Sequence, residues 1–216
     1  TVPDDAVGNV TITVDGEEFT VPVVNGTAIF DLGNNITAGD HNITVNYSGD
    51  DNYNNVTKET NITVDKATID PGDVKVDVTN STYGNVTIVV TVPDDAVGNV
   101  TITVDGEEFI VPVVNGTAIF ELGNNVTAGD HNITVNYSGD DNYNNVTKGT
   151  NITVDKGTVK PDNVIEVIPG DNNITVIVDL PSDATGNVTV TINGTEYTIP
   201  LVDGKGNITI PVKPGE

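Results

Sequence analysis

The feature that most restricts the fold of this chain is an internal repeat with a period of 90 residues. Residues 1–66 superpose on residues 91–156, and a third, more distant copy begins at residue 157. The first two copies differ only at four pairs of positions: Thr20/Ile110, Asp31/Glu121, Ile36/Val126 and Glu59/Gly149. Repetition at a fixed period of this length is the signature of an array of small, similar structural units.

We expect three modules. Residues 67–156 form a complete copy, residues 1–66 form a copy that lacks its first strands, and residues 157–216 form a divergent copy that lacks its last strands. Since the chain starts within a repeat and without Met, we expect it to be a piece of a longer array.

The composition favours an all-β fold. Val, Ile and Thr supply 87 of the 216 residues, against four Leu and eight Ala. Branching at Cβ restricts rotamers in a helix but packs well on a pleated surface. Short alternating runs separated by turn signals about every ten residues are typical of a sandwich of antiparallel sheets. The complete copy therefore predicts seven strands: 74–78, 85–92, 99–104, 107–113, 117–122, 131–137 and 147–154.

Turn chemistry and alternation predict further details of these strands. Asp105-Gly106 and Asn115-Gly116 predict two hairpins, because both central residues of a type I′ turn need positive φ. Pro112 lies inside a strand pattern, so we expect that strand at a sheet edge or at a bulge. Every second residue of the strands gives the predicted core: Val86, Ile88, Val90, Val100, Ile102, Val104, Phe109, Val111, Phe120, Leu122, Ile133, Val135, Tyr137, Ile152 and Val154.

Charge and missing residue types exclude several functions. The formal net charge is −24, which repels nucleic acid and anionic membrane surfaces, so we expect neither as a partner. There is no Cys, so disulfides and thiolate metal sites are excluded. No run approaches the roughly 18 apolar residues of a membrane span, so we expect no membrane insertion. Serine is sparse and no nucleophile elbow is present, so we expect no enzyme.

Two motifs of the chain carry a resemblance to a known family. They are AGDHNITVNYSGDDNY at 128–143 and VDGEEFIVPVVNGTAIFEL at 104–122. Both resemble the tandem bacterial and archaeal immunoglobulin-like repeats of large cell-surface proteins, and are most similar to those of adhesin-like proteins of methanogenic archaea. The first two modules hold both motifs, and the third holds only the half with the Asp-Gly turn. The resemblance implies seven-stranded sandwiches and an extracellular, cell-surface location.

The strongest local signal is the N-glycosylation sequon. Twenty of the 28 Asn head one, whereas random placement gives about 28 × 35/216 ≈ 4.5. Alternation on half-buried strands produces the same pattern, because Asn and Thr two residues apart share the solvent face. We expect glycans on a subset, since bulky groups on adjacent strands collide. The candidates are Asn9, Asn25, Asn35, Asn42, Asn46, Asn55, Asn61, Asn80, Asn85, Asn99, Asn115, Asn125, Asn132, Asn136, Asn145, Asn151, Asn173, Asn187, Asn193 and Asn207.

A repeated acidic loop is a weak candidate for calcium, and no other cofactor is expected. Asp50 and Asp51, with their equivalents Asp140 and Asp141, place hard oxygen ligands beside asparagines in one loop. Calcium takes six to eight oxygens, and no EF-hand spacing is present. The alternative interpretation is a simple turn, in which Asp and Asn tolerate the backbone.

The histidines and tyrosines favour structural roles. His41 and His131 each follow Gly-Asp and have no second His or Cys nearby, so we expect packed or hydrogen-bonded residues rather than ligands. In the family that the chain resembles, an aromatic residue often occupies this place, which implies that His131 is a corner residue that bonds the preceding loop. We expect Tyr137 and Tyr143 to pack the sandwich and its end rather than to bind sugar.

Three functions fit these observations. The first is a structural and adhesive surface protein, in which tandem modules form an extended rod that contacts neighbouring repeats, sister chains or host and microbial surface glycans. The second is a carbohydrate-binding accessory module of a cell-wall enzyme. The third is a strand-donating subunit of an extracellular polymer.

Overall fold

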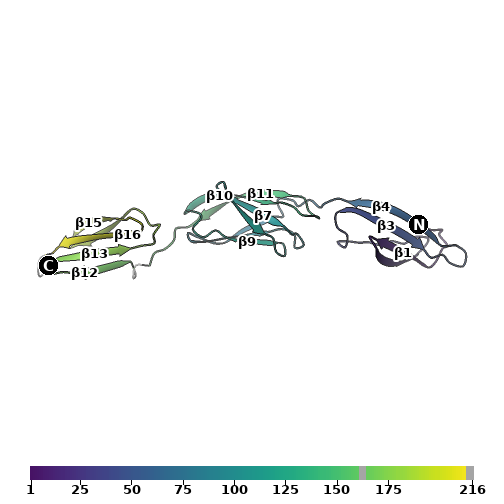
Figure 1. The fold of residues 1–216 in the computed structure, drawn as a ribbon, viewed down its shortest axis with the longest axis horizontal. Helices are drawn as coiled ribbons and strands as arrows, with labels where there is room; N and C mark the ends of the chain where they lie inside the picture. Colours follow the sequence, from purple (N-terminus) through teal and green to yellow (C-terminus); the bar gives the residue numbers. More distant parts are fainter. Residues whose placement is uncertain (161–163, 213–216) are drawn as a thin grey trace. The chain divides into compact units, whose positions relative to one another are not determined.

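The computed structural model describes residues 1–160 and 164–212, and every regular element in them is a β-strand (Figure 1). The chain divides into two compact units, Thr1–Asp155 and Lys156–Glu216. All pairings between the strands are antiparallel, as alternating sequences joined by short turns predict.

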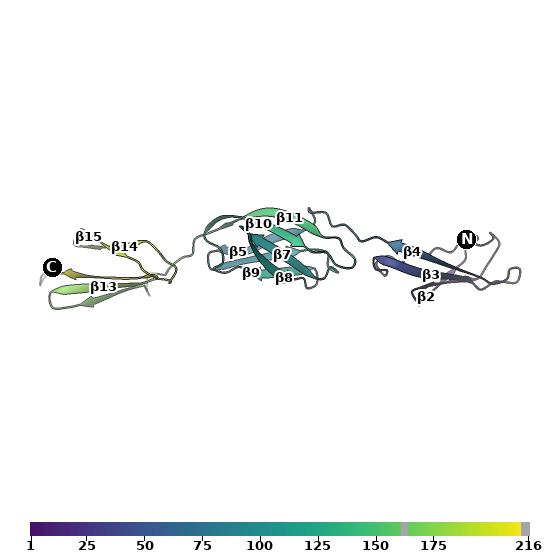
Figure 2. The same ribbon diagram turned by 45° about the horizontal axis from the view of Figure 1, so that its top comes forward.

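The complete module consists of two facing sheets. The three-stranded sheet has the order β5-β6-β9 and the four-stranded sheet the order β11-β10-β7-β8 (Figure 2). The strands are β5 (Lys75–Thr82), β6 (Asn85–Thr91), β7 (Asn99–Val104), β8 (Glu107–Pro112), β9 (Thr117–Glu121), β10 (Gly129–Tyr137) and β11 (Val146–Val154). Six of the seven begin and end within two residues of the predicted range. The strand predicted at 74–78 continues to Thr82, past a register shift between Val78 and Asn80 that interrupts the alternation. The all-β sandwich of seven strands is confirmed.

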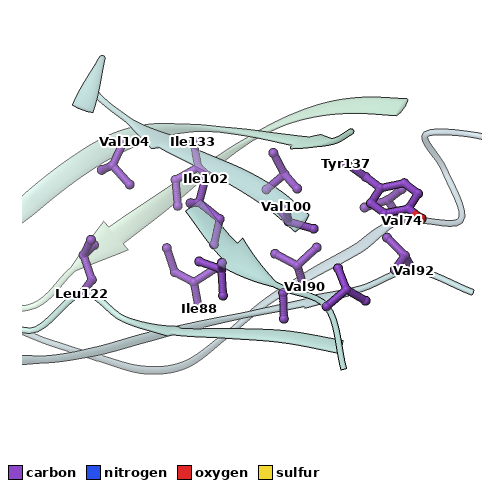
Figure 3. Packing of buried hydrophobic residues seen from close by; sticks show 14 of the residues in the cluster. Val74, Ile88, Val90, Val92, Val100, Ile102, Val104, Leu122, Ile133 and Tyr137 are labelled. Carbon is purple, nitrogen blue, oxygen red and sulfur yellow. The ribbon is translucent and has the colours of Figure 1, made fainter. Parts of the chain in front are cut away.

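The core lies between the two sheets (Figure 3). All fifteen predicted core residues belong to it or pack against it. Phe109 and Phe120 are only partly buried, and their ring centroids lie 4.6 Å apart. Other buried members lie beside the predicted strands rather than in them, for example Ala96 and Val126. Since each large buried side chain contributes about 1.5–3 kcal/mol, packing supplies the stability of a chain without cysteine.

The turns confirm one predicted hairpin and correct the other. Asp105 and Gly106 have φ of 48° and 97° and join β7 to β8 as a hairpin. Asn115 and Gly116 have the predicted positive φ, 49° and 69°, but only the single bridge Val114–Thr117 flanks this turn. The hairpin prediction is wrong here, because β9 pairs with β6 and the turn carries the chain from one sheet to the other.

Pro112 lies at the end of β8, the edge strand of its sheet, as the sequence predicts. At an edge, one side of the strand faces no partner, so the missing N–H of proline costs little.

Residues 1–66 repeat only the four-stranded sheet. The order β2-β1-β3-β4 matches β8-β7-β10-β11 strand for strand. The strands are β1 (Asn9–Val14), β2 (Glu17–Pro22), β3 (Gly39–Tyr47) and β4 (Val56–Val64). No second sheet forms within these 66 residues, all of which the structure describes. The inward face is therefore open, and Val56 is 55% exposed where its equivalent Val146 is 7% exposed.

The second unit holds a three-stranded sheet, β12-β13-β16, and the hairpin β14-β15. Its strands are β12 (Ile165–Pro169), β13 (Asn173–Asp179), β14 (Asn187–Ile192), β15 (Thr195–Pro200) and β16 (Lys205–Pro211). Val176, Val178 and Ile199 form its small core. By sequence and pairing, these strands correspond to β5, β6, β7, β8 and β9 of the complete module.

Candidate functional site

The polar residues that the sequence singles out gather at the two ends of the complete sandwich. At one end, the loop between β10 and β11 is organised around Asp140. Its Oδ1 accepts hydrogen bonds of 2.8 Å from the backbone N–H groups of Asn142 and Tyr143. Its Oδ2 accepts one of 2.9 Å from the backbone N–H of Val97 and one of 2.6 Å from the Tyr137 hydroxyl.

These bonds define the electrostatics of the loop. Burial opposes the ionisation of Asp140, but the hydrogen bonds from the Tyr137 hydroxyl and the three N–H groups outweigh it and hold the pKa of this carboxyl below its usual value. In the first module, the N–H of Val7 is the main contributor to a pKa of about 2 for Asp50. Four donors around one carboxylate fix the loop against the rest of the module.

Tyr137 and Tyr143 both serve the fold. Tyr137 is fully buried and shares its hydroxyl proton between Asp140 and the backbone oxygen of Val97, at 2.8 Å; burial is the main cause of its raised pKa. Tyr143 packs partly buried against the core and donates to Asp95 over 2.7 Å, and this bond is the main reason its pKa rises to about 12. The predicted packing roles are confirmed.

The calcium candidates lie in this loop and its equivalent. Asp50 and Asp140 use both carboxylate oxygens for internal hydrogen bonds, whereas Asp51 and Asp141 are exposed. Nowhere in residues 1–160 and 164–212 do three acidic, cysteine or histidine side chains gather in a way that could hold a metal ion. Calcium at these four residues stays a prediction, and an ion at Asp140 would compete with four donors already in place.

At the other end of the sandwich, His131 joins three segments. Its Nδ1 lies 2.5 Å from Oδ2 of Asp105, in the β7–β8 turn, and its Nε2 lies 2.8 Å from the backbone oxygen of Thr127. Oδ1 of Asp105 accepts the N–H of Asn132 at 3.0 Å. The prediction that His131 bonds the preceding loop is confirmed, and His41 repeats the arrangement.

Both ring nitrogens of His131 face oxygen acceptors, an arrangement that favours the doubly protonated imidazolium. The bond to Asp105 is the main cause of its raised pKa, and the same bond is the main cause of the lowered pKa of Asp105. An imidazolium with both N–H groups bonded has no free lone pair for metal ligation or general-base chemistry.

The sequence does not reveal the partners of these side chains. Asp105 is 26 residues from His131, and Val97 is 43 residues from Asp140. The only available signal was that both members of each pair recur in the first two modules. This repetition fixes the spacing of the two residues along the chain but does not reveal that they are in contact.

The candidate glycosylation sites lie on the surface. Nineteen of the twenty asparagines are exposed and Asn46 is half-buried, where it accepts a hydrogen bond from Thr57. Asn132 lies directly opposite Asn151 on neighbouring strands, and Asn42 opposite Asn61. The two asparagines of such a pair have little room to carry a glycan each, because opposing Cβ atoms are about 4.5–5.5 Å apart.

The complete module has two facing antiparallel sheets, of three and four strands, and a buried tyrosine near a strand end whose hydroxyl bonds back to the backbone. These features define an immunoglobulin-like sandwich. The model of the bacterial Ig-like domain family (group 3) matches residues 1–65 and 74–155, more than half of the chain, and the chain belongs to this family. No curated protein matches it.

Domains of this family are typically non-catalytic and commonly occur outside the cell or on its surface. The described residues contain no helix that could cross a membrane.

Proposed function

We propose that the chain is part of an adhesive, structural cell-surface protein whose tandem Ig-like modules serve as a spacer. One observation carries this proposal: the complete module closes its core without a disulfide, and its distinctive ionisable side chains are occupied by internal hydrogen bonds. Such a module offers a stable, polar exterior rather than a reaction centre.

The exterior supports an extracellular role. A formal net charge of −24 keeps neighbouring chains apart, and exposed Asn and Thr side chains resist hydrophobic association. On the resemblance to the adhesin-like repeats of methanogenic archaea, the source is an archaeon, and the partners are sister chains or glycans on host or microbial surfaces.

Glycans on a subset of the sequons complete this proposal. Turns and loops present asparagine away from neighbouring strands, as at Asn25, Asn115, Asn125 and Asn145, so these sites are occupied in preference to opposed strand positions. Mass spectrometry of native material, with glycopeptides assigned to each asparagine, tests this. Bare asparagine at every site overturns the glycosylated surface.

The spacer role is tested by pulling single full-length chains. Each complete module resists extension until its two sheets separate, and then lengthens by about 3.3–3.6 Å per residue released. A force–extension trace without discrete unfolding events for residues 74–154 contradicts a load-bearing module.

The open face of the first module favours a second candidate, a subunit that accepts strands from another molecule. Val10, Ile12, Val45 and Tyr47 line a hollow of about 570 Å³ on this face. In the complete module, β5 and β6 cover the same positions. Sedimentation at rising concentration separates the two candidates, because strand exchange between copies produces oligomers and a spacer remains monomeric.

A further inference from the structure

The short segment 66–68, which precedes the first strand of the complete module, is bound to that module rather than free. The backbone N–H of Ala67 donates to the Asn142 oxygen at 2.8 Å, and the N–H of Asn144 donates to the Ala67 oxygen at 2.9 Å. Ala67 and Tyr143 thus form a parallel β-bridge. The segment is therefore a one-residue strand added to the β10–β11 loop.

Side chains strengthen the same contact. Nδ2 of Asn144 donates to the backbone oxygen of Lys66 and to Oγ1 of Thr68, both at 3.3 Å. Nζ of Lys66 donates to the backbone oxygen of Asp140 at 2.6 Å. Because the four donors around the Asp140 carboxylate already fix this loop, the segment meets a preformed surface.

The loop also contacts the preceding module directly. Oδ1 of Asn142 accepts a hydrogen bond of 3.0 Å from the backbone N–H of Ala38, in the loop that leads into β3 of the first module. One asparagine therefore bonds the segment through its backbone and the preceding module through its side chain.

Asp155, the residue directly after β11, is held in a similar way by the complete module. The N–H of Asp155 donates to the Ser81 oxygen at 2.6 Å, and the N–H of Tyr83 donates to the Asp155 oxygen at 2.8 Å. Asp155 thereby forms a parallel bridge with Thr82, the last residue of β5.

Asp155 is the repeat equivalent of Asp65, so the two observations describe the two halves of one connection, Asp-Lys-Ala/Gly-Thr. We propose that the β10–β11 loop is a docking site for this connection. Between two complete modules, Asp is then bonded to the module it leaves, and Lys-Ala/Gly-Thr to the module it enters. All four residues of this connection are then hydrogen-bonded to one module or the other. The connection, called the joint below, is therefore a fixed structure and not a flexible linker.

This inference rests on the proposed spacer role, since a fixed joint gives a tandem array reach. It is tested on the purified chain, where neither surface location nor glycosylation enters the result. If the tests of the connection fail, the proposed function still holds, with flexible connections between modules. If the tests of surface location or glycosylation fail, the fixed connection still holds.

Amide hydrogen exchange followed by NMR gives the first test, with a control inside the molecule. Asn54 is the repeat equivalent of Asn144 in the same Gly-Asp-Asp-Asn-Tyr-Asn loop, but its N–H has no partner among the described residues. We expect the amides of Ala67 and Asn144 to exchange at least tenfold more slowly than that of Asn54. Equal rates for Asn144 and Asn54 overturn the proposal.

Matched variants give the second test. The double variant N142A/N144A removes the side-chain bonds to Ala38, Lys66 and Thr68, and N52A/N54A makes the same change in the loop that holds no segment. Neither variant removes a sequon. Because these side-chain bonds hold the segment on the loop, we expect N142A/N144A to speed exchange at Ala67 at least tenfold, and N52A/N54A to leave it unchanged.

Distances between the first two modules complete this test. The chain contains no Cys, so E59C and G149C, at equivalent exposed positions of β4 and β11, accept spin labels selectively. We expect a narrow distance distribution in the parent chain and after N52A/N54A, and a broader one after N142A/N144A. A broad distribution in the parent chain, or the same width in both double variants, overturns the proposal.

Discussion

Replacing Tyr137 by Phe removes one oxygen atom and tests how the Asp140 loop is held. The ring remains, with its full burial, so the core loses almost no packing. The lost hydroxyl served the Asp140 carboxylate at 2.6 Å and the Val97 oxygen at 2.8 Å. A hydrogen bond to a charged group contributes about 1.5–3 kcal/mol, and the backbone oxygen of Val97 loses a partner as well, so we expect the free energy of unfolding to fall by about 2–3 kcal/mol.

The assay must report on the complete module within the whole chain. The slowest-exchanging amides of β7 and β10 do so, because they open only when this sandwich unfolds. A loss of 2–3 kcal/mol makes them exchange about 30- to 140-fold faster. A thermal melt followed by circular dichroism should show the transition of this module lowered by roughly 10–20 °C.

Tyr143→Phe is the matched control. It also removes one tyrosine hydroxyl from the same end of the sandwich, but its partner Asp95 is exposed. Water replaces that bond, so we expect a loss of no more than about 1 kcal/mol. If Tyr137→Phe costs no more than the control, the hydrogen bonds of Asp140 do not hold the loop, and the reasoning is refuted.

Three further predictions concern turns, pH and modification. Gly116→Ala should destabilise the module far more than Gly106→Ala in parallel urea melts. A Cβ at Gly116 would lie 2.6 Å from the backbone oxygen of Pro93, whereas a Cβ at Gly106 would meet nothing within 4 Å. Equal losses of stability would contradict a steric cause. The bond to Asp105 raises the pKa of His131, so the contribution of the imidazolium to stability is full below about pH 6.5 and is lost as the pH rises through the folded-state pKa. Melting temperatures should therefore fall as the pH is raised from about 6.5 in the parent chain, and less so in His131→Phe. If Asn132 and Asn151 are glycosylated at all, intact-protein mass spectrometry should find one glycan for the pair and never two.

The sequence alone determined the strands, the edge position of Pro112 and the composition of the core. These features follow from local chemistry: alternation assigns each side chain to a face, and Asp105-Gly106 dictates positive φ wherever it lies in the chain. The Asn115-Gly116 turn shows where this local information ends. Its dihedral angles were predictable, but whether the next strand pairs with β8 or crosses to β6 depends on the opposite sheet.

Tertiary structure decided the polar contacts. His131 contacts Asp105 at one end of the sandwich and Asp140 contacts Val97 at the other, because each end brings together segments far apart in sequence. The docking of Ala67 on the β10–β11 loop likewise joins residues about one module apart. The first two modules show the same division most directly: Val56 and Val146 stand in nearly identical sequences, yet one is 55% and the other 7% exposed. Sequence gives a side chain its preference for burial, but only a facing sheet removes the water.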